Sequence, residues 1–407
     1  MKKDEGTNSM SRYESKKTLI QKYKICLVNH GDTTSPSSKH IYLLGASLAK
    51  LGHIVTVVFP GATGDVEAID RFFVNRPRLN VVHMKPSFGL KSHYANIVPE
   101  LVFVTSKKFD IVHIWTAKIP LFPGIAARFI RRSKLVIHVE DVELDMARRV
   151  GPLRTISVKT STIIADLFAN GYSFLSPVLA LEARKRLTCN IPAYVMGAGS
   201  DFEMFANPPM EYIIPNKLPS NSILLGLFCS LKARNQYVEA ALEMLTQLDE
   251  RYVLMITGDG KARKIYEQMA KKLKVDKRVI FTGYIADYGA IPSAMQQCDI
   301  LLLPLFDNLE NRQRWPGKLT EYMSSGVPIV TNPIGPAEFL LEDSISASFA
   351  PSVSSNDLAD AVRRVTEFQE MGRKIGATAQ KIARNLDWFN IAKKITSFYD
   401  LIMEKTG

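Results

Sequence analysis

The sequence has few cysteines and no long apolar run. Its four cysteines, Cys26, Cys189, Cys229 and Cys298, are widely spaced and form no Cys-x-x-Cys pair or Cys/His cluster. This spacing argues against a zinc site or a disulfide framework and favours a reducing compartment. No apolar stretch approaches the roughly 18 residues that cross a bilayer, and the N-terminus has no apolar signal core. We therefore expect a cytoplasmic protein without a membrane span.

Acidic residues are also in short supply. Lys and Arg number 52 against 40 Asp and Glu, which gives a formal net charge of +12 and a pI of about 9.4. Such an excess favours anionic partners, namely phosphates, acidic lipid surfaces or nucleic acid. Nucleic acid is the weakest of the three, because the sequence contains no recognisable binding motif or interleaved aromatic platform.

A basic group in the first half is relevant to an acidic lipid surface as a partner. Arg128, Arg131, Arg132 and Lys134 follow the apolar segment 119–125. An apolar patch beside cations predicts a peripheral contact with an anionic membrane, although a solvated charged face is the more common explanation.

The 407 residues are enough for two cores, and the pattern divides them into five parts. Residues 1–22 are charged and poor in large apolar groups, so we expect a disordered leader. Residues 23–205 and 222–387 each alternate apolar strands with amphipathic helices, which predicts two domains with parallel sheets. The proline-rich segment 206–221 reads as a linker, and residues 388–407 as a C-terminal helix.

Residues 300–338 carry the most specific pattern. An apolar strand at 300–305 is followed by a polar loop, a helix from about Pro316 to Gly326, a strand at 327–330 and a Gly/Pro loop. This order places a helix N-terminus at the carboxyl edge of a parallel sheet, where α/β folds bind anionic nucleotides. Lys318 would add a cation, and Glu321 could accept hydrogen bonds from ribose hydroxyls. Taken singly, each is better explained structurally, Lys318 as a solvated helix lysine and Glu321 as a first-turn dipole partner.

Two further loops contain candidate ligand contacts. Gly31, after the first strand, would let a ligand approach the backbone, although an ordinary surface loop is an equal alternative. Ser230, Lys232 and Arg234 follow the first strand of the second half, where two cations could hold a diphosphate.

Carboxylates cluster after the strand at 135–139. Glu140, Asp141, Glu143 and Asp145 stand at its carboxyl end, where acids can orient or activate a substrate. For Glu143 and Asp145 we prefer the role of helix-dipole partners. His113, inside an apolar strand, is at least as well explained as a core histidine.

Several of these stretches resemble glycosyltransferase family 4. The helix and strand Glu321-Tyr322-Met323-Ser324-Ser325-Gly326-Val327-Pro328 are similar to the family's donor-binding segment, as are Gly335 with Glu338. Residues 52–57, Gly-His-Ile-Val-Thr-Val, are similar to a different family pattern, the Gly-His-x-Val-x-Val strand that follows the first loop and helix. The family usually has two glutamates separated by seven residues, and Gln313 stands at the first position here. The run 311–318, Asn-Arg-Gln-Arg-Trp-Pro-Gly-Lys, is similar to a variant found in some members.

The resemblance implies the GT-B fold, with two Rossmann-like domains facing each other across a cleft and a final helix that crosses back to the first. It implies donor contacts at Arg312, Lys318, Glu321, Gly335 and, through the backbone near the base, Gly283 and Tyr284. Asp141 is carried over as catalytic, whereas Glu140 replaces the histidine that many members have.

The predicted function is transfer of a hexose, with retention, from a UDP- or GDP-linked sugar to a glycan or lipid-linked acceptor. The sequence has no Asp-x-Asp, so we expect no catalytic metal and no cofactor. A nucleotide-sugar epimerase remains an alternative. So does a non-catalytic protein that binds sugar nucleotides or polyanions.

Overall fold

The structure is a computed structural model of the whole chain. It describes residues 21–29, 36–60, 78–84, 97–116, 120–141, 143–187, 191–215 and 218–404. Gly31 and most of the expected leader lie outside these ranges.

The first domain is built on a parallel sheet. Its seven described strands have the order β3-β2-β1-β4-β5-β6-β7. They are β1 (Lys24–Val28), β2 (Ile54–Pro60), β3 (Leu79–Met84), β4 (Ile111–Trp115), β5 (Lys134–Val139), β6 (Gly171–Phe174) and β7 (Ala193–Val195). The central strands β1 and β4 are buried on both faces along nearly their whole length, which explains their uninterrupted apolar sequences.

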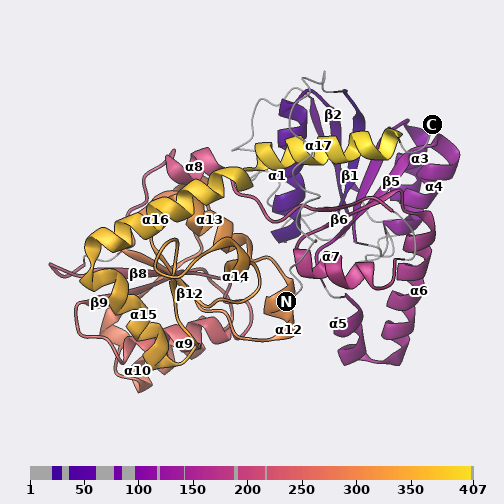
Figure 1. Cartoon of the computed structure of the whole chain (residues 1–407). Helices are drawn as coiled ribbons and strands as arrows, with labels where there is room; N and C mark the ends of the chain where they lie inside the picture. Colours follow the sequence, from indigo (N-terminus) through magenta and orange to yellow (C-terminus); the bar gives the residue numbers. More distant parts are fainter. Residues whose placement is uncertain are drawn as a thin grey trace, which may run out of the picture.

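Helices connect these strands and cover the sheet. They are α1 (Pro36–Lys50), α3 (Ile97–Ser106), α4 (Leu121–Arg131), α5 (Glu143–Val150), α6 (Pro152–Phe168) and α7 (Pro177–Arg184). Helices α3, α4 and α6 lie along one side of the domain in Figure 1, and α1 lies with the C-terminal helix elsewhere on it. A short helix, α8 (Phe202–Ala206), leads toward the second domain.

The second domain repeats the plan with a described sheet of order β10-β9-β8-β11-β12-β13. Its strands are β8 (Ile223–Phe228), β9 (Tyr252–Thr257), β10 (Val279–Gly283), β11 (Ile300–Leu303), β12 (Ile329–Thr331) and β13 (Ser348–Phe349). All their pairings are parallel. The two-residue β13 escaped sequence analysis, because so short an edge strand leaves no periodic pattern. The expected pair of Rossmann-like domains is confirmed.

The helices of the second domain end in two long ones that return to the first (Figure 1). They are α9 (Gln236–Leu245), α10 (Arg263–Lys272), α11 (Ile291–Gln296), α12 (Leu309–Gln313), α13 (Gly317–Ser325), α14 (Pro336–Leu340), α15 (Ser355–Glu367), α16 (Gln369–Ala383) and α17 (Trp388–Glu404). Helix α17 packs on α1, and its Trp388, Ile395 and Tyr399 belong to the first domain's core.

Two histidines join α17 to that core. His113 of β4 lies 2.7 Å from the Tyr399 hydroxyl and 2.8 Å from the Ser173 hydroxyl, and its side chain is fully buried. His53 lies 3.0 Å from the Thr396 hydroxyl. Burial lowers the pKa of His113 to about 3, so the ring is neutral at physiological pH. His113 is therefore a core histidine.

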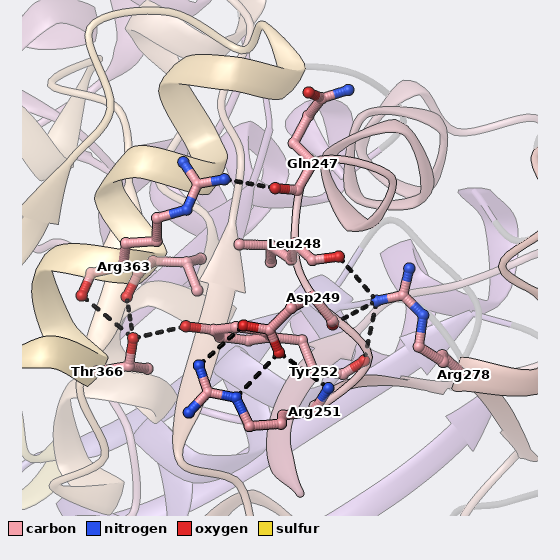
Figure 2. A network of polar contacts seen from close by, with 9 residues as sticks. Gln247, Leu248, Asp249, Arg251, Tyr252, Arg278, Arg363 and Thr366 are labelled. Carbon is pink, nitrogen blue, oxygen red and sulfur yellow. Dashed lines mark hydrogen bonds and ion pairs between the residues drawn. The ribbon is translucent and has the colours of Figure 1, made fainter.

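Arg278 pairs with Glu250 at 3.2 Å but makes most of its contacts with backbone carbonyl groups. Arg278 is buried and donates to the carbonyl groups of Leu248, Asp249 and Tyr252, at 2.8 to 3.4 Å (Figure 2). It also donates to the carbonyl of Leu245 at 3.0 Å. Two of these carbonyls belong to the loop between α9 and β9. Arg278 thus joins the end of α9, the turn after it and the start of β9 through their carbonyl groups.

Candidate functional site

The polar loop expected between β11 and α13 contains a helix of its own, α12. Its N-cap is Asn308, whose side-chain oxygen accepts from the backbone N–H of Asn311 at 2.8 Å. The prediction of a plain loop was wrong, although an asparagine cap was visible in the sequence. Helix α13 then begins after Pro316, as expected, and ends at Gly326, whose φ of +76° is readily adopted by glycine.

Glu321 lies at the centre of a charged cluster between the two domains. The carboxylate is only 4% exposed, and its Oε2 is 2.9 Å from Nζ of Lys318, one helical turn earlier. Its Oε1 pairs with Nζ of Lys39, which belongs to α1 of the first domain, and accepts a hydrogen bond from the Tyr288 hydroxyl at 3.4 Å. The ammonium of Lys39 also lies 4.1 Å from the centre of the Tyr288 ring. Glu321 therefore joins the domains through an ion pair.

This environment keeps Glu321 ionised. Burial alone would raise its pKa, but the ammonium groups of Lys318 and Lys39 outweigh burial and lower the pKa to about 2. The neighbouring His40 is also buried, and burial together with Lys39 lowers its pKa to about 4. Burial lowers the pKa of Lys39, and its pairing with Glu321 acts against that fall. The cluster thus combines an ionised carboxylate with the side chains of Lys39 and Lys318 and a neutral imidazole.

Beside the loop after β8 lies a cavity of about 710 Å³. Ser230, Lys232 and Arg234, the predicted diphosphate contacts, all line it. The opposite lining includes Asn311 and Arg314 of the β11–α13 segment. The carboxyl ends of β8 and β11 thus meet here, and this is the edge where parallel sheets bind nucleotides.

The cavity wall is held together by a chain of polar contacts. Tyr237 donates from its hydroxyl to Oδ1 of Asn311 at 2.7 Å, and Arg314 donates to the same hydroxyl. Arg314 also pairs with Glu310 at 3.4 Å, and Arg234 pairs with Glu239. Three cationic side chains therefore face a common space, and the volume falls in the range of small-molecule sites.

Lys318 belongs to the Glu321 cluster and does not line this cavity, but its charge acts on the end of β8. Burial raises the pKa of Cys229, the residue before Ser230, to about 12, and Lys318 acts against that rise. Lys318 is therefore near the end of β8 as well as bonded to Glu321. The structure brings the predicted Ser230, Lys232, Arg234, Lys318 and Glu321 to one edge of the second domain.

Gly335 and Arg312 support this edge in different ways. Gly335 has φ +58°, and a Cβ there would lie 2.3 Å from the carbonyl oxygen of Asn311. Only glycine lets the β12–α14 loop approach α12 so closely. Arg312 pairs with Asp307 at 2.5 Å and does not line the cavity.

Gly283 and Tyr284 lie at the end of β10. The carbonyl oxygen of Gly283 accepts a hydrogen bond from the backbone N–H of Gly258 at 2.9 Å, while the Tyr284 side chain is 73% exposed. Neither residue lines the 710 Å³ cavity. Their predicted contact with a base stays a prediction.

Asp141 is exposed and follows β5 of the first domain. Its neighbour Glu140 accepts a hydrogen bond from Nε1 of Trp115 at 3.1 Å. The side chains of Glu143 and Asp145 are outside the described part, as is Gly31. The structure therefore places Asp141 at the expected sheet edge.

Hydrogen bonds between the domains surround Gln313, which stands where the resemblance expects a glutamate. The Gln313 carbonyl accepts from the Ser176 hydroxyl, and Thr320 donates to the Ala198 carbonyl at 2.7 Å. The Gln313 side chain is buried, and its Oε1 has no hydrogen-bond partner among the described residues. An ionised glutamate in this buried place would cost more than the neutral amide.

Sequence reasoning missed Tyr288 and did not commit to Lys39 or Arg314. Tyr288 follows a strand in a segment without periodicity, and no local signal links it to Glu321. Lys39 was visible only as one polar residue in the first loop region. Lys39 and Glu321 are 282 positions apart in the chain, so their contact depends on how the two domains dock.

Two general findings concern metals and membranes. Among the described residues, no three His, Cys, Asp or Glu side chains gather as a metal site requires. That the reaction needs no metal stays a prediction. The described helices include none that is long and apolar enough to span a bilayer.

Comparison with known proteins identifies both halves. The family described as Glycosyl transferases group 1 matches residues 226–382, and Glycosyltransferase Family 4 matches residues 37–161, so the two together match more than half of the chain. The alpha-D-kanosaminyltransferase of Streptomyces kanamyceticus is 27% identical over 158 residues, which is 39% of either protein. The chain thus matches well under half of that relative's length.

Solved structures match over nearly the whole chain. Anabaena HepE in complex with UDP and glucose gives a TM-score of 0.70 at 20% identity, covering 93% of this chain and 99% of HepE. Sucrose-phosphate synthase from Thermosynechococcus elongatus gives 0.71 at 15% identity, covering 94% and 99%. These likenesses show the GT-B fold. With its two Rossmann-like domains and both family matches, the chain belongs to the group 1 glycosyltransferases of the family 4 type.

Proposed function

We propose that this protein transfers a hexose from a UDP- or GDP-linked sugar to an acceptor hydroxyl, with retention of configuration. The acceptor is a glycan or a lipid-linked sugar. The observation that supports this most is the 710 Å³ cavity, on which cations from two loops of the donor domain converge. The structure of HepE with UDP and glucose supports a sugar nucleotide as the donor.

The diphosphate of the donor would bind at the cations of this cavity. Lys232 and Arg234 from the β8 loop would neutralise its charge, and Arg314, the residue after α12, would add a planar donor. Lys318, close to the end of β8, would stabilise the charge that develops as the diphosphate leaves. Gly335 and Arg312 would hold the adjoining loop in place.

Glu321 would orient the ribose of the donor. Both carboxylate oxygens already have ammonium partners, so ribose hydroxyls must take the place of Lys39. The base would lie toward the backbone of Gly283 and Tyr284. Donor binding is thereby coupled to the contact between the domains.

The first domain would hold the acceptor, with Asp141 orienting its hydroxyl and Gly31 allowing a close approach. The bond between the sugar C1 and the phosphate oxygen breaks, and a bond forms between C1 and the acceptor oxygen. The acceptor proton passes to the departing diphosphate. We place the reaction in the cytoplasm, at or near an anionic membrane surface, with no nucleic acid and no metal or other cofactor.

A donor screen followed by turnover tests this proposal. Thermal shift with UDP- and GDP-sugars identifies the donor, and release of free nucleotide is then measured with and without membrane extract, in EDTA. Lys232→Ala is the chosen variant, because the side chain is exposed and its loss should not affect folding. Lys272→Ala, also exposed but on α10 away from the cavity, is its matched control.

The proposal expects acceptor-dependent release that falls about tenfold or more in Lys232→Ala and is unchanged in Lys272→Ala. If the donor is converted to its epimer in the absence of an acceptor, the protein is an epimerase and not a transferase. Stabilisation by a donor without any turnover would indicate a binding protein. If no sugar nucleotide stabilises the protein, the donor site is wrong.

A further inference from the structure

Helices α5 and α6 form a hairpin with an exposed apolar tip. They are joined by the single residue Gly151 and pack against each other, and both lie at one end of the first domain in Figure 1. Val150, the last residue of α5, is 76% exposed, and Leu153, near the start of α6, is 84% exposed. Large apolar side chains at a turn are normally packed inward, so this tip is exposed for a reason other than folding.

The apolar surface continues along α6. Leu153, Ile156, Ile163 and Leu167 are all exposed, and their spacing of three, seven and four residues puts them on one side of the helix. The buried Val158 lies on the other side, against the domain. The helix therefore presents two apolar faces, of which the domain covers only one.

The charge around the tip and along most of this surface is positive; Asp166, beside Leu167 at the far end, pairs with Arg186. From Ala147 to Ala165 the chain contains four basic residues and no acidic residue. Arg149, Arg154 and Lys159 of this group are exposed. An apolar stripe bordered by cations is complementary to an anionic lipid bilayer, in which acyl chains lie directly below negatively charged headgroups.

The basic group identified in the sequence is less suited to this role. Arg128 donates to the carbonyl of Phe168 at 2.6 Å and to Oδ1 of Asn170 at 2.7 Å, and Arg131 donates to the carbonyl of Thr105. Both guanidinium groups are used within the domain. The α5–α6 hairpin is therefore the better candidate for a contact with lipid.

We propose that the tip of the α5–α6 hairpin inserts into the interfacial layer of an anionic membrane and holds the acceptor domain there. This rests on the proposed function, which supplies the lipid-linked acceptor. Helix α5 begins two residues after Asp141, and its eight residues span about 12 Å. A tip in the headgroup layer thus puts Asp141 within reach of a sugar attached to a membrane lipid.

The test is co-sedimentation of the full chain with vesicles of phosphatidylcholine alone or with added phosphatidylglycerol. Two variants separate the apolar and the electrostatic contributions of this surface. Val150→Ser with Leu153→Ser removes the apolar tip, and a triple change to Gln at Arg149, Arg154 and Lys159 removes the charge. The matched controls are Ile213→Ser, which is 80% exposed in the segment between the domains, and a triple change to Gln at 271, 272 and 274, three lysines in and after α10.

The wild type should bind only the anionic vesicles. The charge variant should lose binding at least about tenfold, since each cation near such a surface contributes about 1 kcal/mol. The tip variant should lose binding to a similar extent, because it removes apolar area that inserts below the headgroups. Both controls should bind like the wild type. Binding that survives in the hairpin variants, or wild type that binds no vesicle, overturns the proposal. A wild-type dimer that Leu153→Ser converts to monomer, without vesicle binding, assigns the surface to a second copy instead.

Thermal shift with the sugar nucleotide separates this proposal from the proposed function. A hairpin variant that keeps its donor-induced shift but loses vesicle binding has lost the membrane contact alone. If the wild type binds vesicles but no sugar nucleotide stabilises it, the membrane contact is supported and the proposed transferase function is rejected.

Discussion

Replacing Glu321 by glutamine should destabilise the protein, because this carboxylate is the shared partner of two ammonium groups. Glutamine has nearly the same shape, so packing on α13 is conserved while the charge is lost. Lys39 and Lys318 then remain near each other without a carboxylate, and Lys39 stays in the domain interface. The variant therefore isolates the electrostatic contribution of one buried group.

Two estimates of the stability lost in Glu321→Gln agree. The difference between the ordinary pKa of 4.5 and the value of about 2 corresponds to about 3 kcal/mol of stability at neutral pH. Removing one partner from a buried ion pair costs about 3–5 kcal/mol in general. Because domains of this size lose roughly 2–4 °C in Tm per kcal/mol, we expect a fall of roughly 6–12 °C at pH 7.

The effect should depend on pH in one direction. The folded state lowers the pKa of Glu321, so its stabilisation is fully present above the ordinary value of 4.5 and is lost as pH falls toward 2. The difference between wild type and Glu321→Gln should therefore be constant from pH 7 to about 5. Below about 4.5 it should shrink.

Thermal unfolding of both proteins between pH 7 and pH 3 measures this. The double variant with Lys39→Met is the control, because it removes the unpaired ammonium and should recover part of the lost Tm. A Tm within 1 °C of wild type at pH 7 would refute the reasoning. So would a difference that grows as the pH falls.

Three more outcomes follow from other contacts. Lys39→Met alone should tighten UDP binding severalfold by calorimetry, because ribose no longer competes with an ammonium; weaker binding would mean that Lys39 contacts the donor. Gly335→Ala should lower the Tm by several degrees, since its Cβ would lie 2.3 Å from the carbonyl of Asn311; an unchanged Tm would show that the loop can yield. His113→Phe should lower the Tm by breaking the bond to Tyr399, yet leave kcat/KM unchanged, and a selective loss of kcat would contradict its core role.

The fold was readable from the sequence because its signals are local and repeated. Buried parallel strands such as β4 and β11 are short, mainly apolar runs, and their length and the polar or proline residues that flank them favour strands over helices. Glycines and prolines marked the ends of helices such as α13. Strand β13 and helix α12 were missed, since two strand residues or five helical residues carry too little periodicity.

The candidate site could be predicted only in part from the sequence. Lys318 and Glu321 lie one turn apart on the same helix, so their proximity follows from helical spacing. The pairing of Glu321 with Lys39 depends on the docking of two domains, to which no local pattern refers. The burial of Gln313 against α7 has the same origin, and the sequence indicated only that it replaces a glutamate.

Acceptor-dependent release of nucleotide from a UDP- or GDP-sugar tests the central claim most directly. The account predicts that release requires a donor that stabilises the protein, rises with membrane extract and falls about tenfold or more in Lys232→Ala but not in Lys272→Ala. Equal release in both variants, or no stabilisation by any sugar nucleotide, would contradict the assignment of the donor site to the cavity beside β8.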